Sequence, residues 1–195
     1  MLTTFLELQR LKRLDRTGWT LRGLAPGAES VGAHTYGVAV VAMLLADEVA
    51  ARGVSVGTER VLRMAIVHDW AEPRLGDLPR IAVHYFGKEV RGRAERAAFA
   101  DIVRPLGQKV AEKLEAVHDD YEGRASLEAR IVKAADVIDL LAQALLFERA
   151  GVRGLDEFWE GAREYDFGFE GTADNVVASL IEELFLQHEA VLNGA

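Results

Sequence analysis

Residues 131–147 read IVKAADVIDLLAQALLF, and the period of their side chains sets the fold class expected for the whole chain. Thirteen of these 17 residues are apolar, and the four exceptions are Lys133, Asp136, Asp139 and Gln143. On a helix that turns by about 100° per residue, the four polar side chains fall within a stripe about 120° wide. The segment is therefore expected to be a largely buried helix whose polar stripe faces either water or an internal polar site.

The rest of the chain shows the same helical period, interrupted by short segments rich in Gly and Pro. A loop is expected at 23–27 and a turn-rich connection at 70–80, and no alternating strand pattern of useful length occurs. Because the connections are short, we expect an all-α fold with a single compact domain over residues 1–195. The expected helices cover residues 2–14, 29 or 30 to 51, 59–69, 88–104, 107–118, 126–149, 154–163 and 172–192.

The composition narrows the classes of function. The net charge is −8 at pH 7, which disfavours a long nucleic acid as a partner. The chain has no cysteine, so disulfides and thiolate metal sites are excluded and any metal must use His and carboxylate ligands. The first residues alternate apolar and charged side chains, unlike a signal peptide, and the longest apolar run, 38–46, is about half of a membrane span. We expect a cytoplasmic enzyme with no membrane partner.

The strongest local motif is His68-Asp69, followed by Glu72. The pair closes an expected helix just before a bend rich in Pro and Gly, where a rigid support meets an open loop. Adjacent helical residues point about 100° apart, yet both can reach one ion that lies beyond the helix end. The alternative is an ordinary surface His-Asp pair, with Glu72 as a solvated turn residue.

Two further residues could join such a site from other helices. His34 lies four residues before Val38 and therefore shares the face of an expected helix that turns to the core. A single histidine there is either a metal ligand or a hydrogen-bonded core residue. Asp136 is flanked by Val132 and Leu140 at i−4 and i+4, and a carboxylate in such surroundings needs a cation or hydrogen-bond donors.

The order His, His-Asp, Asp on three helices of an all-helical chain resembles the HD-domain superfamily of metal-dependent phosphohydrolases, and most closely its 5′-deoxynucleotidase branch. The resemblance covers nearly the whole chain. The blocks that carry it are LKRLDRTGW at 11–19, ESVGAHT at 29–35, HDWAE at 68–72, GDLP at 76–79 and EARIVKAAD at 128–136.

The resemblance implies a role for each matched residue. It makes His34, His68, Asp69 and Asp136 the ligands of one divalent metal, and Glu72, with Asp69, the catalytic group. Substrate contacts are expected from the residues that line the same blocks or carry suitable charges. These are Trp19 as a pocket wall or a packing residue, Asp77 as a sugar contact or a simple Asx turn, Leu78, Pro79, Glu122, and Arg80 and Lys133 as phosphate partners or solvated cations.

Two positions depart from the family pattern. Ala33 stands where the family often has an acidic residue just before the first ligand histidine, a residue that would orient that histidine. Gly18 stands where some members have an arginine that orients the phosphate. Arg16 and Arg22 are both candidates to replace it.

Two imidazoles and two carboxylates form a mixed nitrogen and oxygen site that suits Mn, Co, Fe, Ni or Zn better than Ca. The candidates for the single divalent ion are these five metals and Mg. The expected reaction is hydrolysis of deoxyribonucleoside 5′-monophosphates to deoxynucleoside and phosphate. The alternatives are another nucleotide, such as a dNTP or a phosphodiester, and a non-catalytic nucleotide- or metal-sensing module. The apolar stripe of 172–192 either packs on its own domain or joins two subunits, and the resemblance favours a homodimer.

Overall fold

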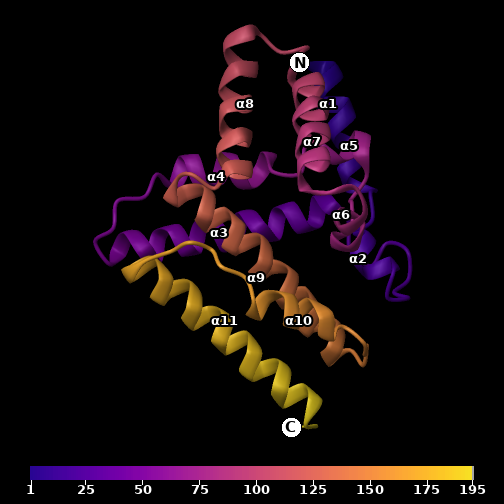
Figure 1. Cartoon of the computed structure of the whole chain (residues 1–195), viewed down its shortest axis with the longest axis vertical. Coiled ribbons are helices and arrows are strands. Elements are labelled where there is room, and N and C mark those ends of the chain that lie inside the picture. Colours follow the sequence, from indigo (N-terminus) through magenta and orange to yellow (C-terminus); the bar gives the residue numbers. More distant parts are fainter. Residues whose placement is uncertain (195) are drawn as a thin grey trace. The chain divides into compact units, whose positions relative to one another are not determined.

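A computed structural model describes residues 1–194, apart from the side chain of Val83. The described residues are helical and turn-forming, with one isolated β-bridge between Asp15 and Ser30 in place of any strand, so the all-α expectation is confirmed. The elements, labelled in Figure 1, are α1 Leu2–Leu8, η1 Gln9–Lys12, α2 Thr17–Thr20, α3 Val31–Ala51, α4 Thr58–Val67, α5 Glu72–Leu75, α6 Arg80–Phe86, α7 Lys88–Val103, α8 Gln108–Gly123, α9 Leu127–Arg149, α10 Asp156–Arg163 and α11 Gly171–Leu192.

The described residues form two compact units. The first unit combines Met1–Tyr36 with Arg63–Gly123, and the second combines Gly37–Leu62 with the chain from Arg124 onward. The boundaries between the units fall inside α3 and α4. The single domain expected from the sequence stays a prediction.

In the first unit, α7 packs against α1, α5 and α8, and Figure 1 shows α1, α5 and α7 side by side. The hydroxyl of Thr4 donates to the carbonyl of Ile102 at 2.9 Å, so it is Thr4 that turns inward from α1. The neighbouring apolar residue Phe5 is 57% exposed. The first helix also ends at Leu8 and continues as a 3-10 turn, which rotates the side chains that follow.

The first unit contains more helix than expected in two places. The connection 70–80 contains α5, whose second residue is Pro73, and leads into α6 at Arg80. Proline is well tolerated in the first turn of a helix, so its presence does not exclude one. Helix α8 runs on to Gly123, and His118 in its third turn is 2% exposed. The helix expected over 107–118 is therefore longer than predicted, and His118 lies in its buried part rather than at its end.

The second unit is organised by α9, against which α10 and α11 pack. The hydroxyl of Ser126 caps α9 by accepting from the backbone N–H of Ala129 at 3.1 Å. The polar stripe of α9 lies partly against protein, because a Cβ added at Gly37 of α3 would collide with the carboxylate of Asp139. Only glycine leaves room for that carboxylate beside α3.

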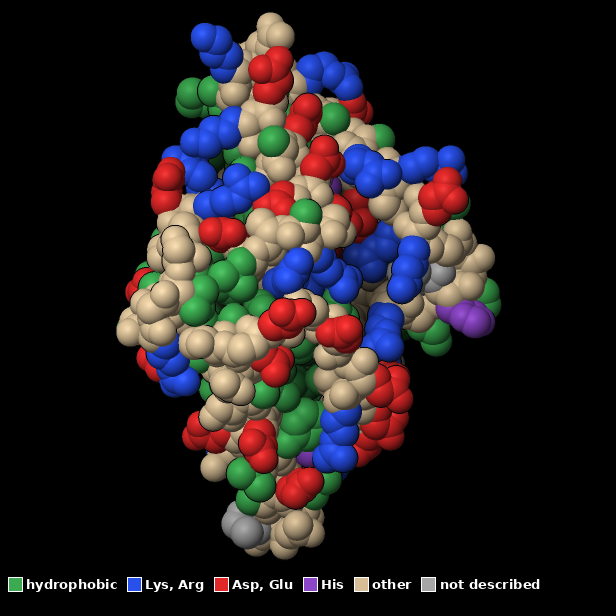
Figure 2. Space-filling model, turned by 60° about the vertical axis from the view of Figure 1, so that its left-hand side comes forward, with side chains coloured by type: hydrophobic (Ala, Val, Ile, Leu, Met, Phe, Trp, Pro, Cys, Tyr) green, Lys and Arg blue, Asp and Glu red, His purple; other side chains and the backbone are tan. Residues whose placement is uncertain are grey.

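Helix α3 is long and apolar enough, by length and composition, to cross a membrane. Helices in the core of water-soluble proteins pass the same test. Its side chains at Val38, Ala42, Leu45 and Val49 are at most 3% exposed, as the helical period predicts for a core face. Figure 2 shows Lys and Arg side chains interspersed with Asp and Glu side chains on the face drawn.

Candidate metal and phosphate site

The His68-Asp69 pair follows directly after the end of α4, at the bend before α5. The Nδ1 atom of His68 lies 2.7 Å from the carbonyl oxygen of Ala65, an acceptor, so Nδ1 carries the proton. The lone pair of the other ring nitrogen, Nε2, is then free to face Oδ2 of Asp69 at 3.1 Å. Two acceptor atoms this close repel unless a proton or a metal ion lies with them, which is the arrangement that a cation site needs.

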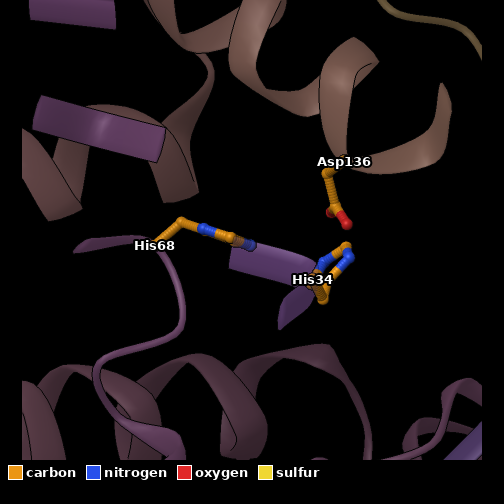
Figure 3. A group of neighbouring side chains, drawn as sticks. All are labelled: His34, His68 and Asp136. Carbon is orange, nitrogen blue, oxygen red and sulfur yellow. The ribbon is translucent and has the colours of Figure 1, made fainter. Parts of the chain in front are cut away.

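His34 enters the same group from the first turn of α3. It is 1% exposed, and its Nε2 lies 3.9 Å from Oδ2 of Asp69. Ligand-competent atoms of His34 and His68 lie within 4.8 Å of one another, with ring centroids 5.6 Å apart. Figure 3 draws both imidazoles, together with Asp136 of α9. Within the first unit, the structure thus brings together three of the four expected ligands.

Three atoms of this cluster lack a hydrogen-bond partner although they are buried. Among the residues that the structure describes, Nε2 of His68, Oδ2 of Asp69 and Oε2 of Glu72 have none. Buried polar atoms in native proteins are almost always satisfied, so such a group calls for an explanation. The imidazole nitrogen of His68 and the carboxylate oxygen of Asp69 are donors that a divalent metal takes, and the Glu72 carboxyl group lies beside them. The residues present therefore fit a metal ion.

The pKa shifts of the carboxyl groups in the cluster also fit a bound cation. Burial alone would raise the pKa of Asp69, but the imidazoles of His68 and His34 lower it to about 2. Burial, followed by the nearby carboxylates of Asp69 and Asp77, raises the pKa of Glu72 far above its ordinary value. A cation beside these carboxylates would stabilise the charged form of Glu72 and lower its pKa again, so the raised pKa of Glu72 fits a site that takes a cation.

Arg16, rather than Arg22, reaches the cluster. Its Nη1 lies 3.9 Å from Oδ2 of Asp69 and its Nε lies 3.7 Å from Oδ2 of Asp77. Arg22 instead donates to the backbone carbonyl of Gly18 at 3.1 Å. The sequence left both arginines open, because only the folded loop shows which one turns back toward the His-Asp pair.

Asp77 and Trp19 both form hydrogen bonds with residues outside their own turn of the chain. The Asp77 carboxylate accepts from the backbone N–H of Thr17 at 2.6 Å, a bond across 60 positions that a local Asx turn would not make. The ring nitrogen of Trp19 donates to Glu29 at 2.5 Å, and Trp19 is 1% exposed. This buried position of Trp19 is compatible with both expected roles, a packing residue and a wall of the substrate pocket.

The remaining expected site residues lie as follows. Leu78 and Pro79 are half-buried in the loop between α5 and α6, Arg80 is exposed at the start of α6, and Glu122 is half-buried near the end of α8. On α9, the ammonium group of Lys133 lies 2.6 Å from Oδ2 of Asp136. Burial would lower the pKa of Lys133, but the Asp136 carboxylate outweighs it and raises that pKa. The sequence predicts a cation or hydrogen-bond donors beside Asp136. Lys133, on the same helix, is such a cation.

Two aromatic neighbours of the cluster were missed in the sequence. Tyr121 of α8 is 7% exposed and meets the His68 ring edge-on, with centroids 5.4 Å apart. His118, one turn earlier, stacks on Phe99 at 4.1 Å. Had α8 been extended to Gly123, the helical period would have placed 117, 118 and 121 on its buried face.

The fold and the cluster together define an all-α protein whose mixed imidazole and carboxylate group could hold a divalent metal. Residues 8–160, more than half of the chain, match the family model of the HD domain. The chain belongs to the HD domain family.

Named relatives and a solved structure agree with this assignment. The chain is 35% identical over 162 residues to the 5′-deoxynucleotidase hdd1 of Schizosaccharomyces pombe, covering 79% of this chain and 77% of that protein. It is 34% identical over 148 residues to the 5′-deoxynucleotidase HDDC2 of Homo sapiens, covering 75% and 68%. The crystal structure of the PH0347 protein from Pyrococcus horikoshii OT3 superposes with a TM-score of 0.80 at 32% identity, covering 96% of this chain and 99% of that one.

Proposed function

We propose that this protein is a metal-dependent 5′-deoxynucleotidase, which hydrolyses deoxyribonucleoside 5′-monophosphates to deoxynucleoside and phosphate. The observation that carries the proposal is the group of buried, unsatisfied atoms on His68, Asp69 and Glu72. Relatives that carry the name 5′-deoxynucleotidase, at 34 and 35% identity, supply the substrate class.

The proposed ligands of one divalent ion are His34, His68, Asp69 and Asp136. Three belong to the cluster described above, and Asp136 is assigned by the resemblance of its block, EARIVKAAD, to the family segment with the last ligand. Mn, Co, Fe, Ni, Zn and Mg all suit this donor set. When bound, such an ion polarises a phosphoryl group and lowers the pKa of water.

Glu72 is proposed to handle the proton of the reaction. It begins α5, its backbone N–H donates to the Asp69 carbonyl at 3.0 Å, and its Oε2 is buried. A carboxyl group held beside the ligand Asp69 can take a proton from the attacking water or give one to the leaving alkoxide.

Arg16 is proposed to orient the phosphate. It would replace the arginine that some family members have at the position of Gly18. It faces Asp69 and Asp77 across 3.7–3.9 Å, which places a guanidinium group, a good partner for oxyanions, beside the proposed ligand Asp69. Asp77 is proposed to contact the sugar. The other proposed substrate contacts are Trp19, Leu78, Pro79, Arg80, Glu122 and Lys133.

The test is a phosphate-release screen with the purified protein loaded with Mn, Co, Mg or Zn in turn. We expect phosphate from deoxynucleoside monophosphates, less from the matching ribonucleotides, and none after chelation. Phosphate release from no monophosphate with any metal would contradict the proposal. Pyrophosphate or triphosphate from a dNTP would reassign the substrate, and tight nucleotide binding without turnover would indicate a sensor.

We also propose a single-domain, cytoplasmic homodimer without membrane or nucleic-acid polymer as partner. The net charge of −8 disfavours a polyanion. The half-exposed stripe of α11, which includes Leu184 and Phe185, offers apolar surface to a second subunit. Sedimentation of the purified chain tests the dimer directly.

A further inference from the structure

The segment between α10 and α11 carries aromatic residues at every second position. Tyr165, Phe167 and Phe169 are half-buried, whereas Asp166 and Gly168 between them are exposed. The ring centroids of Tyr165 and Phe167 lie 4.7 Å apart, and those of Phe167 and Phe169 lie 6.1 Å apart. Each ring therefore lies near the next one along the segment, which bends at Gly168, where φ is 67°.

One arginine fixes this segment to the start of α9. Arg130 donates to the carbonyls of Gly168 at 2.8 Å, of Arg124 at 3.2 Å and of Ala125 at 3.3 Å. The backbone N–H of Gly168 donates to Asp166 at 2.7 Å. The guanidinium group thus locks the turn before α9 and the aromatic segment together, so Tyr165 is held in a defined place.

The hydroxyl of Tyr165 is the unexplained group in this arrangement. It is buried, and it has no hydrogen-bond partner among the residues that the structure describes. A phenylalanine would fill the same space without burying an unsatisfied hydroxyl, so packing alone does not account for tyrosine here. A hydroxyl in such a position calls for a partner outside the chain, which is either a bound water molecule or a ligand.

The surroundings of Tyr165 indicate the chemistry of that partner. The guanidinium carbon of Arg124 lies 5.2 Å from the ring centroid, and Nζ of Lys133 lies 5.9 Å from it. Lys133 in turn is paired with Asp136. A phenol that donates a hydrogen bond, with two cations beside its ring, suits an acceptor that carries negative charge.

We propose that the Tyr165 hydroxyl donates a hydrogen bond to the phosphate group of the substrate and of the phosphate product, with Arg124 and Lys133 supplying positive charge. The proposal rests on the proposed function, in which Asp136, the partner of Lys133, is a metal ligand. It makes Tyr165 a substrate-positioning residue outside the blocks that carry the family resemblance.

Tyr165→Phe is the discriminating variant, because it removes only the hydroxyl. Tyr85→Phe is the matched control, since Tyr85 is 81% exposed. Titration calorimetry with inorganic phosphate, on the metal-loaded protein, measures binding without turnover. We expect the affinity for phosphate to fall about tenfold in Tyr165→Phe, as for loss of one hydrogen bond to a charged group, and to stay within about twofold in the control.

The melting temperature separates this role from a structural one. Without ligand, Tyr165→Phe is expected to melt at the same temperature as the wild type or above it, because an unsatisfied buried hydroxyl has been removed. With the deoxynucleoside monophosphates, its KM is expected to rise more than its kcat falls. Deoxynucleosides, which lack the phosphate, serve as the negative ligand.

The two proposals fail in different ways. If wild-type protein binds phosphate with Tyr165-dependent affinity but hydrolyses no monophosphate, the proposed function fails and the Tyr165 assignment stands. If wild type hydrolyses monophosphates and Tyr165→Phe matches it in phosphate affinity and KM, the Tyr165 assignment is overturned. Absence of any phosphate binding by the wild type would overturn it as well.

Discussion

Nη1 of Arg16 lies 3.9 Å from Oδ2 of Asp69, which makes Arg16 the cation that reaches the His-Asp pair from the N-terminal block. Replacing it by glutamine should lower kcat/KM for deoxynucleoside monophosphates about 10- to 100-fold, because a charge-assisted hydrogen bond to phosphate is lost. Steady-state phosphate release measures this. Arg22→Gln is the control, since Arg22 is bonded to Gly18. Equal losses in the two variants would contradict the assignment of Arg16.

Glu72→Gln should separate metal binding from chemistry. The amide keeps the size of the side chain but can neither take nor give the proton, so kcat is expected to fall about 10²- to 10⁴-fold. Metal content and melting temperature should stay near wild type, because Glu72 is not a proposed ligand. A variant that retains most of its kcat would show that another group handles the proton.

His118 should make stability depend on pH. Burial lowers its pKa to about 4, below the ordinary value near 6.5, so the unfolded chain takes up a proton at a higher pH than the folded one. The stability that the neutral ring contributes is fully present above about pH 6.5 and is lost as the pH falls toward 4. By pH 4.5 the loss should be about 2–3 kcal/mol of the free energy of unfolding.

Urea unfolding of the metal-free protein at pH 7 and pH 4.5 measures the effect. His118→Phe lacks the titrating ring, and its loss of stability between the two pH values should be smaller than that of the wild type by this amount. If wild type and variant lose the same free energy, the buried ring does not titrate as described. His84→Phe, on exposed α6, is the comparison that removes a histidine without removing a buried one.

Glu148 should be a large contributor to the stability of the second unit. Its carboxylate accepts from Trp159 at 3.1 Å and lies 2.8 Å from Nδ1 of His188, and the Trp159 and His188 rings stack at 4.0 Å. Glu148→Ala would leave both partners buried without an acceptor, and about 3–5 kcal/mol of the free energy of unfolding should be lost. Glu189→Ala, which breaks the exposed pair with Arg163, should cost under about 1 kcal/mol. Similar values for the two variants would contradict this account.

The helices and the metal-site motif could be predicted because both depend on local pattern. Helix α9 begins within one residue of expectation, since Ser126 is a recognisable cap, and the His-Asp pair lies at a helix end as its context indicated. Contacts between segments far apart in sequence could not be predicted. Arg16 facing Asp77 and the contact of Thr4 with Ile102 are set by tertiary packing.

Tyr165 and His118 illustrate a second limit. Both are single polar residues without a motif, and only burial in the folded chain shows that each needs an explanation. The helical period of α8 could have revealed His118, had the helix been extended beyond it. For Tyr165 the sequence offers only the alternation with Phe167 and Phe169, which is too short to distinguish from an ordinary loop.

The metal content of the purified protein tests the central claim most directly. After loading with Mn and desalting, elemental analysis should find about one equivalent per chain in wild type and in the control His84→Ala. His34→Ala, His68→Ala, Asp69→Ala and Asp136→Ala should each retain much less, because removal of one of four ligands weakens a shared site. Wild-type protein without bound metal, or full occupancy in all four variants, would contradict the account.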